Sequence, residues 1–269
     1  MSIVLHLSDT HFGTEQPGVV EALLQLAMDQ APDLLVLSGD VTQRARQRQF
    51  EAALGFLKRM PVPNILVLPG NHDIPLFNLL ERLVSPYRNY QRSFGTDLEP
   101  EFESRDLLVI GVNTTRPSRH TVGAITLDQV ERVSRRLRTA GAAQLRIVAT
   151  HQPVRVIRDS DEKNLLRGHE AAVHAWSEAG ADIILAGHIH LPHVRPLQEV
   201  FTDLPRRVWS VLAGTAVSSR VRKDVLNSVN LIHYLEREGE RQCIVERWDH
   251  DGRDAFVLAA NHTLHLQRP

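Results

Sequence analysis

The chain has almost no cysteine, since Cys243 is the only one among 269 residues. One cysteine cannot form an intrachain disulfide, which excludes a small disulfide scaffold and leaves no set of thiolates for a metal site. No apolar run approaches the roughly 18 residues of a membrane span, and the N-terminus lacks the basic start and long apolar stretch of a signal peptide. We therefore expect a cytoplasmic protein without a membrane partner.

An excess of one charge is also lacking. The chain has 31 Lys and Arg residues against 32 Asp and Glu residues, and only 5% of its residues are aromatic. This composition provides neither a global attraction to nucleic acid nor an obvious stacking platform for it. The Walker P-loop, the GxGxxG dinucleotide fingerprint and the GxSxG nucleophile elbow are absent as well. The sequence thus gives no support for a nucleic-acid partner, for serine catalysis or for nicotinamide chemistry.

Short apolar runs followed by polar residues and glycine dominate the first two thirds of the chain. Continuous rather than alternating hydrophobicity is typical of strands that are buried on both faces. Helical stripes lie between several of these runs, at residues 20–28, 50–57 and 127–137. The alternation predicts parallel βαβ units in an α/β fold. The predicted strands are Ile3–Leu7, Leu34–Leu37, Ile65–Leu68, Leu107–Val112, Ile147–Ala149 and Ile183–Ala186.

The pattern changes after about residue 195. Val208–Leu212, Val229–Leu235 and Cys243–Trp248 are predicted strands without long helices between them. We interpret this part as an antiparallel continuation of the core that ends in an exposed tail. Because no internal repeat or convincing linker is present, we expect one domain over residues 1–269, with a motif-bearing core at 1–195 and a mainly β part at 196–269.

Histidine is abundant, with 14 residues, and many histidines follow predicted strands together with Asp and Asn. Asp9, Asp40 and Asn71 are spaced by 31 residues each, about one strand–helix–strand period. In open α/β sheets ligands bind at the carboxyl ends of the strands, so these groups should converge there. The strand-end groups are Asp9, His11, Asp40, Asn71, His72, His151, His188 and His190.

Imidazole and carboxylate groups without thiolate suit Fe, Mn, Zn, Co or Ni rather than a calcium cage or a structural zinc site. Seven such side chains, with His72 left aside, exceed what one tetrahedral ion needs and suit two ions that share a carboxylate. Turn and capping chemistry would explain Asp40 or Asp73 singly. It would not explain four histidines in addition.

Five motifs in this order resemble those of the calcineurin-like metallophosphoesterase superfamily. They are Asp9-x-His11, Gly39-Asp40, Gly70-Asn71-His72-Asp73, His151 and Gly187-His188-x-His190, and they cover residues 9–190. The resemblance implies a single-domain, four-layer αββα sandwich and a phosphoesterase with a dinuclear metal centre of Fe, Mn, Zn or Co. It also implies that a metal-bridging hydroxide acts as the nucleophile.

The resemblance implies a role for each strand-end group. One metal would be held by Asp9, His11, Asp40 and His190, and the other by Asp40, Asn71, His151 and His188. Asp40 would bridge the two ions, and His72 would be the catalytic histidine that binds no metal. An imidazole beside the leaving group can donate a proton or a charged hydrogen bond.

The motifs also differ from one branch of the superfamily. Serine/threonine phosphoprotein phosphatases continue Gly-Asp with two residues and then Asp-Arg-Gly, whereas this chain continues Gly39-Asp40 with Val-Thr-Gln-Arg-Ala. Ser8-Asp9-Thr10-His11-Phe12 and the compact length look more like class III cyclic-nucleotide and glycerophosphodiester phosphodiesterases. We therefore expect hydrolysis of a small phosphodiester such as a 3′,5′-cyclic nucleotide.

Other activities stay open at this point. A nuclease or a phosphomonoesterase could use the same centre, and a non-catalytic metal-binding scaffold would have no need of His72. Hydrolysis of a nucleotide-sugar-lipid pyrophosphate would require an apolar cap, and Ile74–Phe94 shows no clearly amphipathic lid. The oligomeric state is likewise not determined by the sequence.

Some polar residues outside the motifs are candidates for substrate binding. Arg116 follows a predicted strand, and Arg220 follows another among small residues; either guanidinium could bind a phosphate, or be an ordinary loop cation. His6 is expected to be a hydrogen-bonded core histidine. His169 and His174 are spaced by five residues, which does not suit two metal ligands on one helix face.

Overall fold

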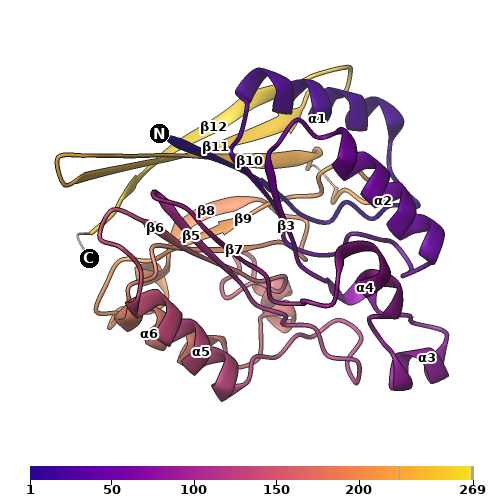
Figure 1. The fold of residues 1–269 in the computed structure, drawn as a ribbon, viewed down its shortest axis with the longest axis horizontal. Coiled ribbons are helices and arrows are strands. Elements are labelled where there is room, and N and C mark those ends of the chain that lie inside the picture. Colours follow the sequence, from indigo (N-terminus) through magenta and orange to yellow (C-terminus); the bar gives the residue numbers. More distant parts are fainter. Residues whose placement is uncertain (224, 268–269) are drawn as a thin grey trace.

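The computed structural model describes residues 1–223 and 225–267, which form two six-stranded sheets packed face to face (Figure 1). In spatial order, the first sheet contains β12 (Phe256–His265), β11 (Glu240–His250), β10 (Ser228–Arg237), β1 (Ser2–Leu7), β2 (Leu34–Leu37) and β3 (Asn64–Val67). The second contains β4 (Glu101–Glu103), β5 (Leu107–Gly111), β6 (Leu145–Ala149), β7 (Ile183–Ala186), β9 (Trp209–Leu212) and β8 (His193–Pro196).

Helices cover the outer face of each sheet, so the fold is the expected four-layer αββα sandwich. The first sheet carries α1 (Pro17–Gln30) and α2 (Gln47–Arg59), and the second carries α5 (Leu127–Arg138) and α6 (His169–Ala179). Two short helices, α3 (Leu79–Val84) and α4 (Arg88–Phe94), lie between β3 and β4 in the chain. Among the described residues, no helix has the length and apolar character needed to cross a bilayer.

The burial of each strand explains its continuous apolar sequence. In β2, Leu35 and Leu37 pack toward the helices, while Leu34 and Val36 pack between the sheets. Alternate side chains of a strand point to opposite faces, and here both faces are covered. Neighbouring strands are parallel in the pairs β1–β2, β2–β3, β5–β6 and β6–β7. Their carboxyl ends therefore lie at one edge of the sandwich.

The C-terminal part supplies strands to both sheets. β9 joins the second sheet, and the antiparallel strands β10, β11 and β12 extend the first. The segment expected as an exposed tail is a strand: residues 256–265 pair with β11, and although most of their side chains are exposed, Phe256 and Leu264 are buried. At the start of β12 the side chains of Val257 and Leu258 are both exposed. The pairing of β12 with β11 shifts its register nearby, between Arg247 and Trp248.

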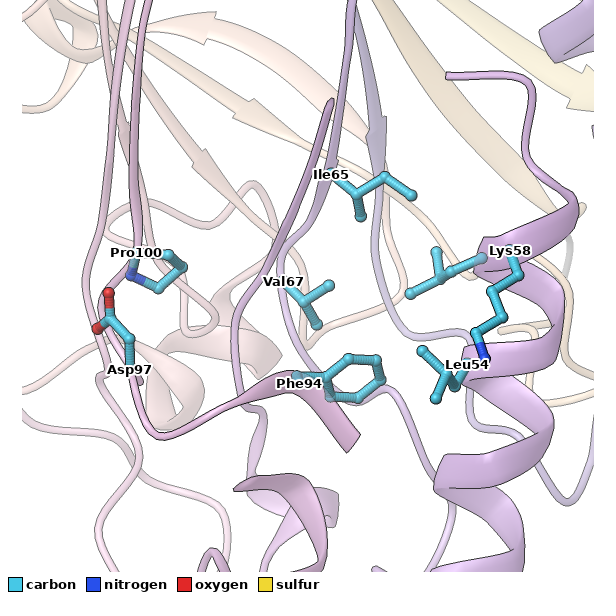
Figure 2. Close-up of a pocket in the computed structure, with 8 residues that line it drawn as sticks. Leu54, Lys58, Ile65, Val67, Phe94, Asp97 and Pro100 are labelled. Carbon is cyan, nitrogen blue, oxygen red and sulfur yellow. The ribbon is translucent and has the colours of Figure 1, made fainter. Parts of the chain in front are cut away.

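A small apolar cavity lies on the outer side of the first sheet (Figure 2). It has a volume of about 290 Å³ and is lined by side chains of α2, β3, α4 and the segment that follows α4. None of the predicted metal ligands lines it. It therefore belongs to the packing between helices and sheet edge rather than to the strand-end site.

Candidate metal centre

The structure brings the predicted ligands together at the carboxyl ends of the parallel strands. Two groups form, Asp9–His11–His190 and Asp40–His151–His188, and within each group the potential ligand atoms lie within 4.8 Å of one another. Asp40 lies between the groups, since its Oδ2 is 3.8 Å from His11 Nε2 and its Oδ1 is 3.2 Å from His151 Nε2. The Oδ1 atom of Asn71 is also 3.2 Å from His151 Nε2.

Hydrogen bonds at the back of two rings orient their front nitrogens. His190 Nδ1 donates to the carbonyl of Arg220 over 2.6 Å, and His151 Nδ1 donates to the carbonyl of Ser38 over 2.9 Å. A carbonyl can only accept, so in the neutral rings the Nε2 lone pairs point into the site. Such outer hydrogen bonds are the usual means of orienting metal-binding histidines.

The nitrogen and oxygen side-chain atoms that face the inside of the site are acceptors when the rings are neutral, which is what a cation requires. His190 Nε2 lies 3.1 Å from both His11 Nε2 and Asp9 Oδ1. His188 Nδ1 is buried and has no hydrogen-bond partner among the described residues. Unpaired buried polar atoms are costly unless an ion or a proton satisfies them. The residues thus fit two metal ions, one for each group.

The backbone at these residues is strained. Non-glycine residues rarely adopt positive φ, and each such residue costs on the order of 1 kcal/mol or more. Here the chain turns sharply off the ends of β1, β2 and β7, which directs the side chains into the site. Five predicted ligands have this conformation: Asp9 (φ 53°), His11 (42°), Asp40 (50°), His188 (70°) and His190 (54°).

Glycines allow the strand-end loops to approach one another. A Cβ atom on Gly187 would lie 1.8 Å from Ser8 Oγ and 2.4 Å from Asp9 Oδ2. A Cβ atom on Gly70 would lie 2.0 Å from the backbone nitrogen of Asp40. Both positions therefore require glycine, because any side chain would displace a predicted ligand.

The charges of the site attract cations. Burial opposes ionisation of the two carboxyls, but His190 holds the pKa of Asp9, and His151 that of Asp40, below the usual range. Burial lowers the pKa of His11 to about 3. Burial also lowers the pKa of His151, yet the adjacent Asp40 outweighs it and raises this pKa to about 9. Asp40 thus attracts a positive charge at the point where the two groups meet.

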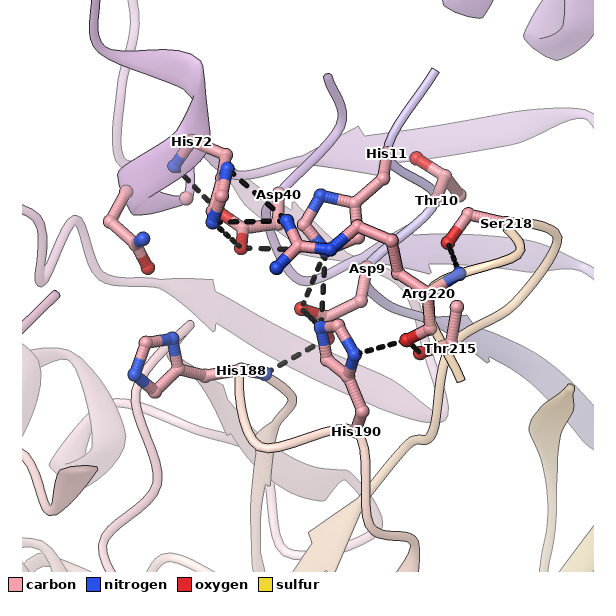
Figure 3. A network of polar contacts seen from close by, with 12 residues as sticks. Asp9, Thr10, His11, Asp40, His72, His188, His190, Thr215, Ser218 and Arg220 are labelled. Carbon is pink, nitrogen blue, oxygen red and sulfur yellow. Dashed lines mark hydrogen bonds and ion pairs between the residues drawn. The ribbon is translucent and has the colours of Figure 1, made fainter. Parts of the chain in front are cut away.

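His72 lies beside the two groups without belonging to either (Figure 3). Its backbone N–H donates to Asp40 Oδ1 over 2.8 Å, and its Nδ1 donates to the carbonyl of Gln43 over 3.0 Å. Its Nε2 is 4.0 Å from Asp40 Oδ2, and its side chain is 15% exposed. His72 can therefore reach both the centre and an incoming molecule.

Arg220 is at the same place although it is 148 residues away in the chain. Its Nη1 lies 3.3 Å from His72 Nε2 and donates to Gln43 Oε1 over 2.9 Å. Its carbonyl holds His190, as described above, so the residue contacts both sides of the centre (Figure 3). Arg116 is placed differently: its guanidinium donates to the carbonyls of Asn113 and Thr115 and to Gln129 Oε1.

Two residues near the site, Asp73 and His120, were given no role in the site from the sequence. Asp73 accepts hydrogen bonds from the backbone nitrogens of Val41, Thr42 and Gly70, and so ties the loops after β2 and β3 together. The ring centre of His120 lies 6.2 Å from that of His72. The position of its loop after a predicted strand was the only available signal for His120.

The expectation that His6 is a hydrogen-bonded core histidine is confirmed. His6 is fully buried and hydrogen-bonds to Ser38 Oγ over 2.9 Å. His169 and His174 lie on α6, and neither belongs to the metal groups found among the described residues. Cys243 is buried in β11, and burial raises the pKa of its thiol far above the usual range, so it belongs to the core.

Comparison with known families agrees with this geometry. Residues 3–192 match the family described as calcineurin-like phosphoesterase. The chain is 22% identical over 260 residues to a probable glycerophosphodiester phosphodiesterase of Arcobacter nitrofigilis, with 88% of this chain and 90% of the relative covered. It is 26% identical over 166 residues to a probable cyclic nucleotide phosphodiesterase of Synechococcus sp., with 60% and 58% covered.

Solved structures share the fold. A dimetal phosphatase from Danio rerio superposes with a TM-score of 0.70 at 12% identity, with 99% of each chain covered. The purple acid phosphatase PPD1 from yellow lupin seeds gives a TM-score of 0.74 at 14% identity. That alignment covers 97% of this chain but spans only 53% of the lupin protein.

Proposed function

The chain belongs to the calcineurin-like phosphoesterase family of metal-dependent hydrolases, and on that premise we propose that it is a dinuclear phosphodiesterase for small phosphodiesters such as 3′,5′-cyclic nucleotides. The observation that carries the proposal is the pair of acceptor groups, Asp9–His11–His190 and Asp40–His151–His188, at one sheet edge. The choice of a diester is supported by the names of the two curated relatives. We treat residues 1–269 as one metallophosphoesterase domain.

We assign the ligands as two sets that share Asp40. The first set is Asp9, His11, Asp40 and His190, and the second is Asp40, Asn71, His151 and His188. Their nitrogen and oxygen atoms suit Fe, Mn, Zn or Co. Two such ions, when bound, would lower the pKa of a water molecule to give a strong nucleophile and would neutralise charge on the phosphoryl oxygens.

The chain's own residues would then position the diester and protonate the leaving group. With Nδ1 of His72 held by the Gln43 carbonyl, Nε2 is the nitrogen that faces an incoming substrate. A proton on Nε2 can pass to the leaving oxygen, which prevents the release of a free alkoxide. The Arg220 guanidinium, 3.3 Å away, can donate a charged hydrogen bond to a phosphoryl oxygen.

The test is a substrate panel on metal-reconstituted protein. We expect turnover of bis-p-nitrophenyl phosphate and cyclic AMP to exceed that of p-nitrophenyl phosphate and of single-stranded DNA. Asp40→Ala should abolish turnover and lower the metal content measured by mass spectrometry. Full activity after thorough chelation would disprove the metal-dependent mechanism. A strong preference for the monoester or for DNA would disprove only the substrate class.

A further inference from the structure

Helix α3 carries an exposed apolar surface that the proposed catalysis does not use. None of its residues is buried, and the large apolar side chains of Phe77 and of the helix point into solvent. Soluble proteins rarely gather so many exposed apolar side chains without a binding partner. We call this group the α3 surface: Phe77 (80% exposed), Leu79 (73%), Leu80 (73%), Leu83 (83%) and Val84 (66%). A six-residue helix is too short to show a recognisable amphipathic period in the sequence, so only the structure reveals the α3 surface.

The α3 surface is fixed next to the mouth of the metal centre. Arg82 on α3 donates to the carbonyls of Pro75, Pro117 and Arg119, over 3.0, 2.6 and 2.7 Å. The loop that contains Pro117 and Arg119 also carries His120, the neighbour of His72. A groove of about 460 Å³ runs between α3 and this loop. The apolar surface and the catalytic histidine thus share one face of the protein.

The segments in contact with the α3 surface are rich in arginine and poor in acidic residues. Segments 41–48, 74–94 and 113–123 contain eight arginines but only one acidic residue, Glu81, in a chain whose net charge is −1. The segments are in contact: the Arg44 guanidinium lies 5.5 Å from the centre of the Phe77 ring, and Asn89 donates to the carbonyl of Ala45.

None of these eight guanidiniums pairs with a carboxylate within residues 1–223 and 225–267. Arginines on other faces do pair, as Arg59 does with Glu21 over 2.6 Å and Arg222 with Asp161 over 2.8 Å. Arg82 and Arg116 are held by hydrogen bonds within the protein. The arginines available to an anionic partner are therefore the other six: Arg44, Arg46, Arg48, Arg88, Arg92 and Arg119.

We propose that the α3 surface and its surrounding arginines dock the protein on an anionic lipid bilayer. Apolar side chains with a basic rim are suited to this, because the former enter the acyl boundary while the latter contact lipid phosphates. A second copy of the chain would bring two arginine-rich faces together, and a nucleic acid would gain little from exposed leucines. The absence of a long apolar run was the basis for expecting no membrane partner. A peripheral contact with a bilayer does not need such a run.

The test is co-sedimentation of the full chain with vesicles of phosphatidylcholine alone or mixed three to one with phosphatidylglycerol. We expect binding to the mixed vesicles, weak binding to phosphatidylcholine, and a loss of binding at high salt. Leu80→Ser/Leu83→Ser should weaken binding at least tenfold, and R88Q/R119Q should weaken it about fivefold per arginine. Val257→Ser/Leu258→Ser, which removes two exposed apolar side chains of β12, is the matched control and should bind like the parent.

The outcomes separate docking from catalysis because sedimentation involves no turnover. Unchanged hydrolysis of bis-p-nitrophenyl phosphate and an unchanged circular dichroism spectrum would show that the leucine variant is folded. The proposal is overturned if the parent does not sediment with anionic vesicles, or if the leucine variant binds as well as the β12 control. Equal binding of a single-stranded oligonucleotide by the parent and the leucine variant, without vesicle binding, would identify a nucleic-acid surface instead.

Discussion

Replacement of Gly187 by alanine should remove a metal ion although none of the predicted ligands is substituted. The new Cβ atom would lie 1.8 Å from Ser8 Oγ and 2.4 Å from Asp9 Oδ2, whereas non-bonded heavy atoms prefer about 3.5 Å. Asp9 must therefore move by more than about 1 Å, and a misplacement of that size at an active site costs roughly 100-fold in rate. Overpacking should also lower the free energy of unfolding by about 1–3 kcal/mol.

The assay combines urea unfolding, metal analysis and turnover of bis-p-nitrophenyl phosphate. Gly187→Ala should lose the ion held by Asp9, His11 and His190 and retain the other. Gly55→Ala is the matched control, because Gly55 is an exposed glycine of α2 with no atom within 4 Å of an added Cβ. That variant should be more stable by up to about 1 kcal/mol and fully active. A Gly187→Ala protein with two ions and parental activity would refute the reasoning.

Three further predictions concern the chemistry of the site. His72→Ala should keep its metal content but slow hydrolysis by about 10²–10⁴-fold, with a smaller loss for nitrophenyl leaving groups, which need no proton; an equal loss of metal would show that His72 is a ligand. Arg220→Ala should lower kcat/KM about 10- to 100-fold, the value of one charged hydrogen bond, while its backbone carbonyl still holds His190; a drop in metal content would point to a structural role. In chelated protein, the pKa of His151 is raised to about 9, so the stability from its pairing with Asp40 is present below pH 6.5 and is lost as the pH rises through 9. Calorimetry should therefore show a falling melting temperature over that range, and added metal should oppose the fall because metal and proton compete for His151; a flat profile in the chelated protein would contradict this.

The strand-end groups could be found from the sequence because each depends on local pattern. Apolar runs that are buried on both faces and separated by helical stripes indicate parallel strands. The polar residues immediately after each run then indicate the ligands of the site, because ligands bind at the carboxyl ends of such strands. Arg116 and Arg220 had the same kind of local signal. The structure separates them, because the Arg116 guanidinium contacts its own loop and Gln129, whereas Arg220 reaches His72.

The sequence by itself determined the α/β class, the order of the five motifs and the set of donor atoms available to metal ions. The tertiary structure alone decided which nitrogen of His151 and His190 faces inward, and that Arg220 lies beside His72. It also decided that the apolar side chains of α3 stay in solvent and that residues 256–265 pair with β11. Periodicity reports only neighbours along the chain, whereas the contacts of the site join residues up to 181 positions apart, as Asp9 and His190 are, and depend on how both sheets pack.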